Sequence, residues 1–179
     1  MSERSLSYPI GPDPQNSDAS PEQIKKWIAD IESFPFRLAA QCEGTSIEQL
    51  NWPYRPGGWT LKQLVHHCAD SHLNSIMRFK LALTEEQPTI KPYYEDRWAL
   101  SPEAQDDDIS NSLKLIEALH HKWVAILKSI SPQDWARSYI HPEHGRAISL
   151  KEALGSYAWH CNHHLAHFAQ GLRSAGSYK

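Results

Sequence analysis

The sequence contains few of the residues that favour β-strands. Among its 179 residues there are 2 Val and 4 Thr, against 17 Leu. Strands favour β-branched side chains, whereas helices favour Leu, Ala, Glu, Lys and Gln. The 13 Ile weaken this contrast without reversing it. The composition therefore indicates a helical fold.

Other absences exclude whole classes of protein. No run of 18 apolar residues occurs, so we expect no membrane span. The first twenty residues lack the apolar stretch of a secretory signal, and we therefore expect a cytoplasmic protein. The three cysteines, Cys42, Cys68 and Cys161, are odd in number and widely spaced, which favours reduced thiols in the core over disulfides. A net charge of −3 argues against a nucleic-acid partner, which would require a basic face.

Length and proline positions predict the organisation of the chain. Residues 1–19 are polar and proline-rich and are expected to form an extended arm, followed by a single domain over 20–179. The 12 prolines leave three long windows free, 57–87, 103–131 and 143–179. Since a proline inside a helix costs about 3 kcal/mol, long helices are expected in these windows.

Four long amphipathic helices are predicted. The first starts at Ser20-Pro21, is kinked by Pro35 and ends near Gly44, and the others cover about 61–83, 109–130 and 150–173. Ser20, Thr60 and Ser149 are each followed three residues later by Gln or Glu, the pattern of a capping box. A helical turn is expected at 47–50, a long loop with one turn at 84–108, a short turn from Ser131, and a loop at 139–148. The fold class is therefore all-α, a four-helix bundle with long connections.

Histidines are concentrated in the last predicted helix. Of the 11 histidines in the chain, four lie at 160, 163, 164 and 167. Two imidazoles four residues apart on a helix can chelate one metal ion. The angle around the helix axis, measured from the direction of the apolar residues, is about 60° for His164 and about 100° for His160. It is about 120° for His167 and about 160° for His163, which therefore points towards solvent. These angles favour the pair His160 and His164.

A third ligand must come from another helix. His66 and His67 both lie about 130° from the apolar direction of their helix, so helical geometry does not separate them. His72 and His120 lie on the apolar faces of their own helices and are real alternatives. The residues alone leave the third ligand open.

Four stretches of the sequence resemble one known family. They are LSYPIG at 6–11, YRPGGWTLKQLVHHCADSH at 54–72, RFKLALTEEQPTIKPY at 78–93 and YAWHCNHHLAHF at 157–168. The chain is similar in these stretches to the DinB-like superfamily, and specifically to its YfiT branch of metal-dependent hydrolases. The resemblance implies a four-helix bundle with a three-histidine site formed by His67, His160 and His164. It also implies one divalent metal ion per subunit and a cytoplasmic homodimer. Three imidazoles suit Zn²⁺, with Ni²⁺ as the alternative.

Three functions are compatible with this site. The first is a metal-dependent hydrolase in which the three-histidine site activates bound water for attack on a small-molecule substrate. The second, also implied by the resemblance, is a metal-dependent S-transferase that uses a low-molecular-weight thiol such as bacillithiol. The third is a non-catalytic metal- or ligand-binding protein, which an open coordination position disfavours.

Other polar residues are weaker candidates for the site. Asp70, three residues after His67, is a candidate base or hydrogen-bond acceptor for a ligand imidazole. His66, His163 and His167 are expected beside the ligands or at the surface. His141 and His144 are expected to be solvated loop residues, with a place at the rim of the site as the alternative.

Overall fold

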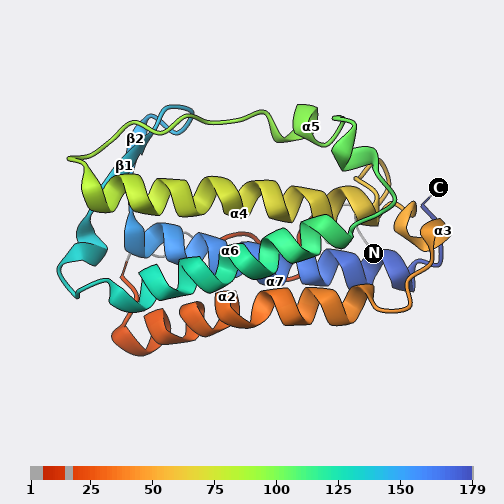
Figure 1. Cartoon of the computed structure of the whole chain (residues 1–179), viewed down its shortest axis with the longest axis horizontal. Coiled ribbons are helices and arrows are strands. Elements are labelled where there is room, and N and C mark those ends of the chain that lie inside the picture. The colour runs from red at the N-terminus through yellow and green to blue at the C-terminus, as the bar shows by residue number, and fades with distance from the viewer. Residues whose placement is uncertain (1–5, 15–17, 179) are drawn as a thin grey trace.

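The computed structural model describes residues 6–14 and 18–178 as four long helices joined by short elements (Figure 1). The long helices are α2 (Pro21–Cys42), α4 (Leu61–Thr84), α6 (Ser110–Ser129) and α7 (Leu150–Arg173). The short elements are α3 (Ile47–Leu50), α5 (Glu95–Trp98), the 3-10 helices η1 (Glu103–Gln105) and η2 (Asp134–Ala136), and the strands β1 (Ser138–His141) and β2 (Arg146–Ser149). The predicted four-helix bundle is confirmed.

Three helix starts follow the predicted caps, with two differences in detail. Thr60 forms the full capping box with Gln63, whereas Ser20 accepts a hydrogen bond from the backbone of the helix without the reciprocal contact. At Ser149 the box is also incomplete, because the carboxylate of Glu152 is engaged elsewhere. It accepts two hydrogen bonds from Arg146, at 2.5 and 3.0 Å, and this bidentate pair joins β2 to the first turn of α7.

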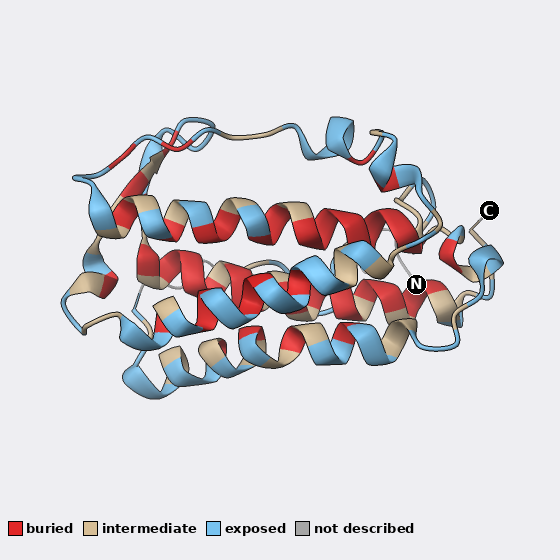
Figure 2. Ribbon diagram, viewed as in Figure 1, coloured by how far each residue is buried: buried red, intermediate tan, exposed pale blue. Residues whose placement is uncertain are grey.

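The long helices surround one apolar core. Helices α2 and α4 each pack against both α6 and α7, so these two consecutive long helices lie diagonally opposite each other. Large core side chains come from all four helices: Phe34, Phe79, Trp123 and Phe168, each fully buried. Helices α4 and α7 are buried most completely, with 15 of 24 residues each, against 4 of 22 in α2 and 6 of 20 in α6 (Figure 2). Their shared interface is therefore the best-shielded place for a polar site.

The loop expected at 139–148 is instead part of a β-hairpin. Tyr139 pairs with Ile148 in an antiparallel register. The chain before α5 adds to it, since Ile90 N donates to Ile140 O at 3.0 Å and Ile140 N donates to Pro88 O at 2.8 Å. The hairpin was missed because its stability depends on these contacts with a segment 50 residues away. The preceding connection contains α5 and η1 where one turn was expected.

Residues 6–14 lie against α7. Leu6 is buried, and its carbonyl accepts hydrogen bonds from Gln170 Nε2 at 3.0 Å and His167 Nε2 at 3.2 Å. Trp159 Nε1 donates to the carbonyl of Gly11 at 3.0 Å. In the described part of the chain, no helix combines the length and apolar character needed to cross a membrane.

Candidate metal centre

Three histidines from α4 and α7 converge in the interior of the bundle. The Nε2 atom of His160 lies 3.2 Å from Nε2 of His67 and 3.1 Å from Nε2 of His164. Within the described residues, these three side chains form a group in which one ligand atom of each lies within 4.8 Å of the others. Tetrahedral zinc with Zn–N bonds of 2.0–2.1 Å would separate two ligand nitrogens by about 3.3 Å. The spacing therefore fits a single small cation.

Burial keeps these imidazoles neutral at neutral pH. It lowers the pKa of His67 to about 4. Burial, reinforced by the neighbouring imidazoles, lowers the pKa of His160 and His164 well below the ordinary value. Neutral imidazole is the form that coordinates a metal through a ring lone pair. The three side chains are therefore in the protonation state that a metal ion requires.

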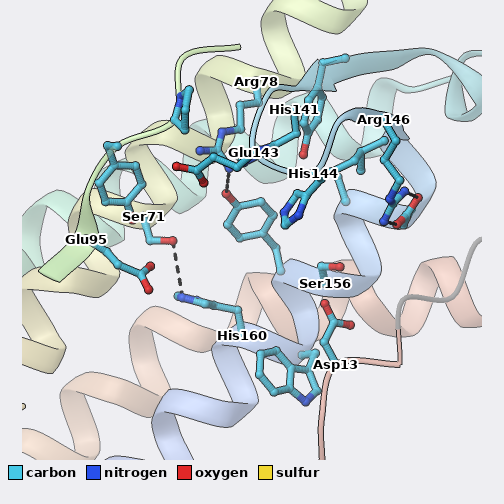
Figure 3. A pocket seen from close by; sticks show the side chains of 18 of the residues that line it. Asp13, Ser71, Arg78, Glu95, His141, Glu143, His144, Arg146, Ser156 and His160 are labelled. Atoms are coloured by element: carbon cyan, nitrogen blue, oxygen red, sulfur yellow. Dashed lines mark hydrogen bonds and ion pairs between the residues drawn. The ribbon is translucent and has the colours of Figure 1, made fainter. Parts of the chain in front are cut away.

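A cavity of about 630 Å³ opens beside His160 (Figure 3). Its lining residues come from α4, the α5 region, the hairpin and α7, and include Ser71, Arg78, Tyr93, Glu95, His141 and Tyr157. Ser71 Oγ lies 3.5 Å from His160 Nε2, and both residues line the cavity. A space of this size holds a small-molecule ligand. The cavity thus reaches the histidine group at His160, the one of the three that lines it.

The two ends of this cavity differ in their polar groups. Figure 3 shows Glu95 on the same side as Ser71 and His160. Its carboxyl has a raised pKa, caused first by partial burial and then by the carboxylates of Asp96 and Glu143. At the other end, Arg78 donates a hydrogen bond to Tyr157 Oη at 3.2 Å. Glu95 therefore places a carboxylate, and Arg78 a guanidinium, in the cavity that reaches His160.

The structure separates His66 from His67. The ring of His66 turns towards α6 and the connection before it, where Nδ1 contacts Ser112 Oγ at 2.8 Å and Nε2 contacts the Asp106 carbonyl at 3.1 Å. The ring of His67 turns towards α7, with Trp59 packed against it at a ring-centroid distance of 4.7 Å. His67 is therefore the member of the pair that joins His160 and His164.

His163 does not point to solvent, contrary to the angle of about 160° on the helical wheel. It is 7% exposed and stacks on Trp159 with ring centroids 4.2 Å apart. Tyr8 lies over it at 6.0 Å, and His167 is buried beneath Leu6. The predicted exposure of His163 was wrong because a helical wheel considers one helix alone. It does not include residues 6–14, which cover this face of α7.

The other residues considered in the sequence lie outside the three-histidine group, and only some of them line the cavity. Asp70 is half-buried on α4, does not line the cavity and is not in the histidine group; burial raises its pKa to about 6, with a smaller contribution from Glu103. His141 is buried and His144 exposed, and both line the cavity, which corresponds to the alternative position at the rim. Burial raises the pKa of both Cys68 and Cys161, so their thiols stay protonated in the core.

Sequence reasoning missed Glu95. It lies in the connection between two long helices, where the aromatic and acidic residues show no helical period. The only signal available was the unusual length of that connection, because long loops often close over a site. The loop's path along α4 brings Glu95 to the cavity (Figure 1).

Comparison with known proteins agrees with this architecture. The DinB superfamily model matches residues 31–168. The chain is 44% identical over 176 residues to "Putative metal-dependent hydrolase YfiT" of Bacillus subtilis (strain 168), covering 98% of this chain and 99% of that protein. It is 46% identical over 164 residues to "Putative metal-dependent hydrolase BcerKBAB4_2443" of Bacillus mycoides (strain KBAB4), covering 92% and 94%.

A solved structure is similar over almost the whole chain. It is that of YfiT from Bacillus subtilis, described as a probable metal-dependent hydrolase with an unusual four-helix bundle topology. The TM-score is 0.93 at 45% identity, and the match covers 96% of this chain and 98% of the other. Sequence and fold together show that the chain belongs to the DinB superfamily.

Proposed function

We propose that this protein is a metal-dependent hydrolase whose divalent metal ion, zinc in the first instance, is held by His67, His160 and His164. The observation that carries the proposal is the convergence of three Nε2 atoms, from the buried His67 and His164 and the partly buried His160, beside a cavity. The names of its relatives, which describe metal-dependent hydrolases, support the same reading.

The donor set favours a catalytic over a structural metal. Structural zinc normally has four protein ligands, whereas catalytic zinc has three and an open position. No fourth His, Cys, Asp or Glu of the described residues joins the group. When bound, such an ion supplies Lewis-acid chemistry, lowering the pKa of water and polarising a carbonyl group.

Residues of the cavity would bind and orient the substrate. The Ser71 hydroxyl lies 3.5 Å from His160 Nε2, in position to hydrogen-bond a substrate oxygen near the histidines. Arg78, fixed by its hydrogen bond to Tyr157, can bind a polar or anionic group at the far end. These contacts would hold the scissile bond next to the open position.

Glu95 is the carboxylate best suited to proton transfer. It lines the same cavity as His160, and its raised pKa brings it closer to neutral pH, where a general base is most effective. Asp70 also has a raised pKa but does not line the cavity. We therefore propose Glu95 as the base in place of Asp70.

The direct test is hydrolysis of a panel of esters, amides and lactones by the zinc-loaded protein in ¹⁸O-labelled water. A hydrolase incorporates ¹⁸O into the product acid, loses activity with a chelator and regains it with zinc. The His67→Ala variant serves as the metal-free control. If the panel is turned over equally well by that variant, the proposal is wrong.

The thiol-transfer alternative is separated in the same assay. Adding cysteine, glutathione or bacillithiol would then give a thiol adduct without ¹⁸O, at the expense of the labelled acid. Metal-dependent formation of such an adduct with no labelled acid would replace the hydrolase proposal by S-transfer. We expect the thiol to come from the substrate, because Cys68 and Cys161 are fully buried and protonated and Cys42 does not line the cavity.

A further inference from the structure

A chain of hydrogen bonds crosses the bundle from α2 to the histidine group. The carbonyl of Ile31 on α2 lies 2.7 Å from His120 Nδ1 on α6. His120 Nε2 lies 2.8 Å from His72 Nδ1 on α4, and His72 Nε2 lies 3.1 Å from His160 Nδ1 on α7. Each of the four long helices therefore contributes one member. His72 and His120 are 0% and 1% exposed.

The direction of these hydrogen bonds follows from their fixed end. A carbonyl oxygen can only accept, so His120 donates through Nδ1. A neutral imidazole has a single N–H, which leaves His120 Nε2 as the acceptor for His72 Nδ1–H. By the same rule, His72 Nε2 accepts from His160 Nδ1–H. The Nε2 atom of His160 is then left with its lone pair, facing His67 and His164.

The surroundings keep these rings neutral and in place. Burial lowers the pKa of His120 to about 4 and that of His72 still further. Phe34 stacks on His120 with ring centroids 5.4 Å apart and meets His72 edge-on at 5.1 Å. Trp123 lies against both rings, at 5.5 and 5.8 Å. Ring rotation and entry of water are both opposed by this packing.

His164 lacks such support. Its Nδ1 is buried and makes no hydrogen bond within the described residues. The other nitrogen of a metal-binding histidine normally donates to a partner that fixes the tautomer and raises the basicity of the ligand. The three-member chain from Ile31 supplies this partner to His160.

We propose that His72 and His120 are positioning residues that hold His160 in the Nδ1–H tautomer, with its Nε2 lone pair directed at the metal centre. The role depends on the proposed function, because it matters only if a metal binds there. In the reverse tautomer, His160 would carry its proton on Nε2, where the ion has to bind. Loss of a partner of this kind typically weakens metal affinity 10- to 100-fold.

Two measurements test this proposal. In protein labelled with ¹⁵N-histidine, long-range ¹H–¹⁵N correlation spectra should show protonated Nδ1 in His72, His120 and His160, with and without zinc. Zinc competition with a fluorescent chelator should show 10- to 100-fold weaker binding in His120→Leu. The exposed neighbour provides a matched control, and His121→Leu should retain wild-type affinity.

A polar replacement separates positioning from packing. In His120→Leu, the Nδ1–H group of His72 loses its hydrogen-bond acceptor, so His72 is free to adopt the Nε2–H tautomer. His160 Nδ1 would then have to accept a hydrogen bond from His72, and the Nδ1–H signal of His160 should weaken or disappear. His120→Gln retains a donor and an acceptor and should recover much of the zinc affinity. Protonated Nε2 in His72 or His120 of the wild-type protein would overturn the proposal, even if a variant failed to fold. Failure of the wild-type protein to bind either zinc or nickel would instead refute the proposed function, since the tautomers can be read without metal.

Discussion

The Nε2 atoms of His67 on α4 and His160 on α7 face each other at 3.2 Å, in the interface between the two most buried helices. A cation held between them would therefore link two helices, and removing either side chain should empty the site.

We expect His67→Ala, His160→Ala and His164→Ala each to abolish stoichiometric metal, because two imidazoles alone bind weakly. His163→Ala should retain the metal, since its ring stacks on Trp159 outside the group. Elemental analysis of the four purified variants measures this. Loss of the metal in His163→Ala, with retention in the His164 variant, would reverse our assignment of the last helix.

Glu95→Gln should lower turnover by about 10²- to 10⁴-fold, the usual contribution of a positioned base. Its metal content should not change, because Glu95 lies outside the histidine group. The comparison is with Asp70→Asn, which we expect to keep near wild-type activity. If Asp70→Asn is the inactive variant and Glu95→Gln is active, the base has been assigned to the wrong carboxylate.

Asp70 should also reduce stability at neutral pH. Its pKa rises from 3.8 to about 6 in the folded protein, so ionisation favours the unfolded state. This loss of stability is complete above pH 6. It vanishes below about pH 4, where the Asp70 carboxyl is protonated in both the folded and the unfolded protein. After allowance for solvent screening of a half-buried group, Asp70→Asn should raise the free energy of unfolding at pH 8 by about 1 kcal/mol. Urea unfolding at pH 8 and pH 3.5 should show this gain only at the higher pH.

The buried histidines should make the metal-free protein sensitive to acid. Burial lowers the pKa of both His120 and His167 from 6.5 to about 4. Between these values the unfolded state binds more protons, so the free energy of unfolding decreases as the pH falls from 6.5 towards 4. Urea unfolding at pH 7.5 and 5.0 measures the loss, and His167→Gln should reduce it. Equal stability at the two pH values would disagree with neutral buried imidazoles.

The long helices could be predicted from the sequence because their determinants are local. Side-chain caps mark the starts of α2, α4 and α7, and the apolar period of each helix is complete within it. The hairpin could not be predicted in this way, because β1 is paired with residues near Ile90 and its edges are set by tertiary contacts. Burial of His163 depends likewise on residues at the other end of the chain.

In the histidine site, too, some features could be predicted from local sequence and others depend on tertiary contacts. Spacing in one helix was enough to favour His160 and His164, whereas the choice of His67 over His66 rested on resemblance, since both lie at the same angle from the apolar face. The structure distinguishes them by what each ring faces, Ser112 on one side and His160 on the other. His72 and His120 were alternatives as ligands, and their connection to His160 through Nδ1 could not be read from either helix alone.

The most direct test of the whole account is a crystal structure of the protein loaded with one equivalent of zinc. We expect a single ion bound by Nε2 of His67, His160 and His164, with its remaining position open to the cavity. A fourth protein side chain on the ion, or zinc bound only elsewhere, would contradict the account.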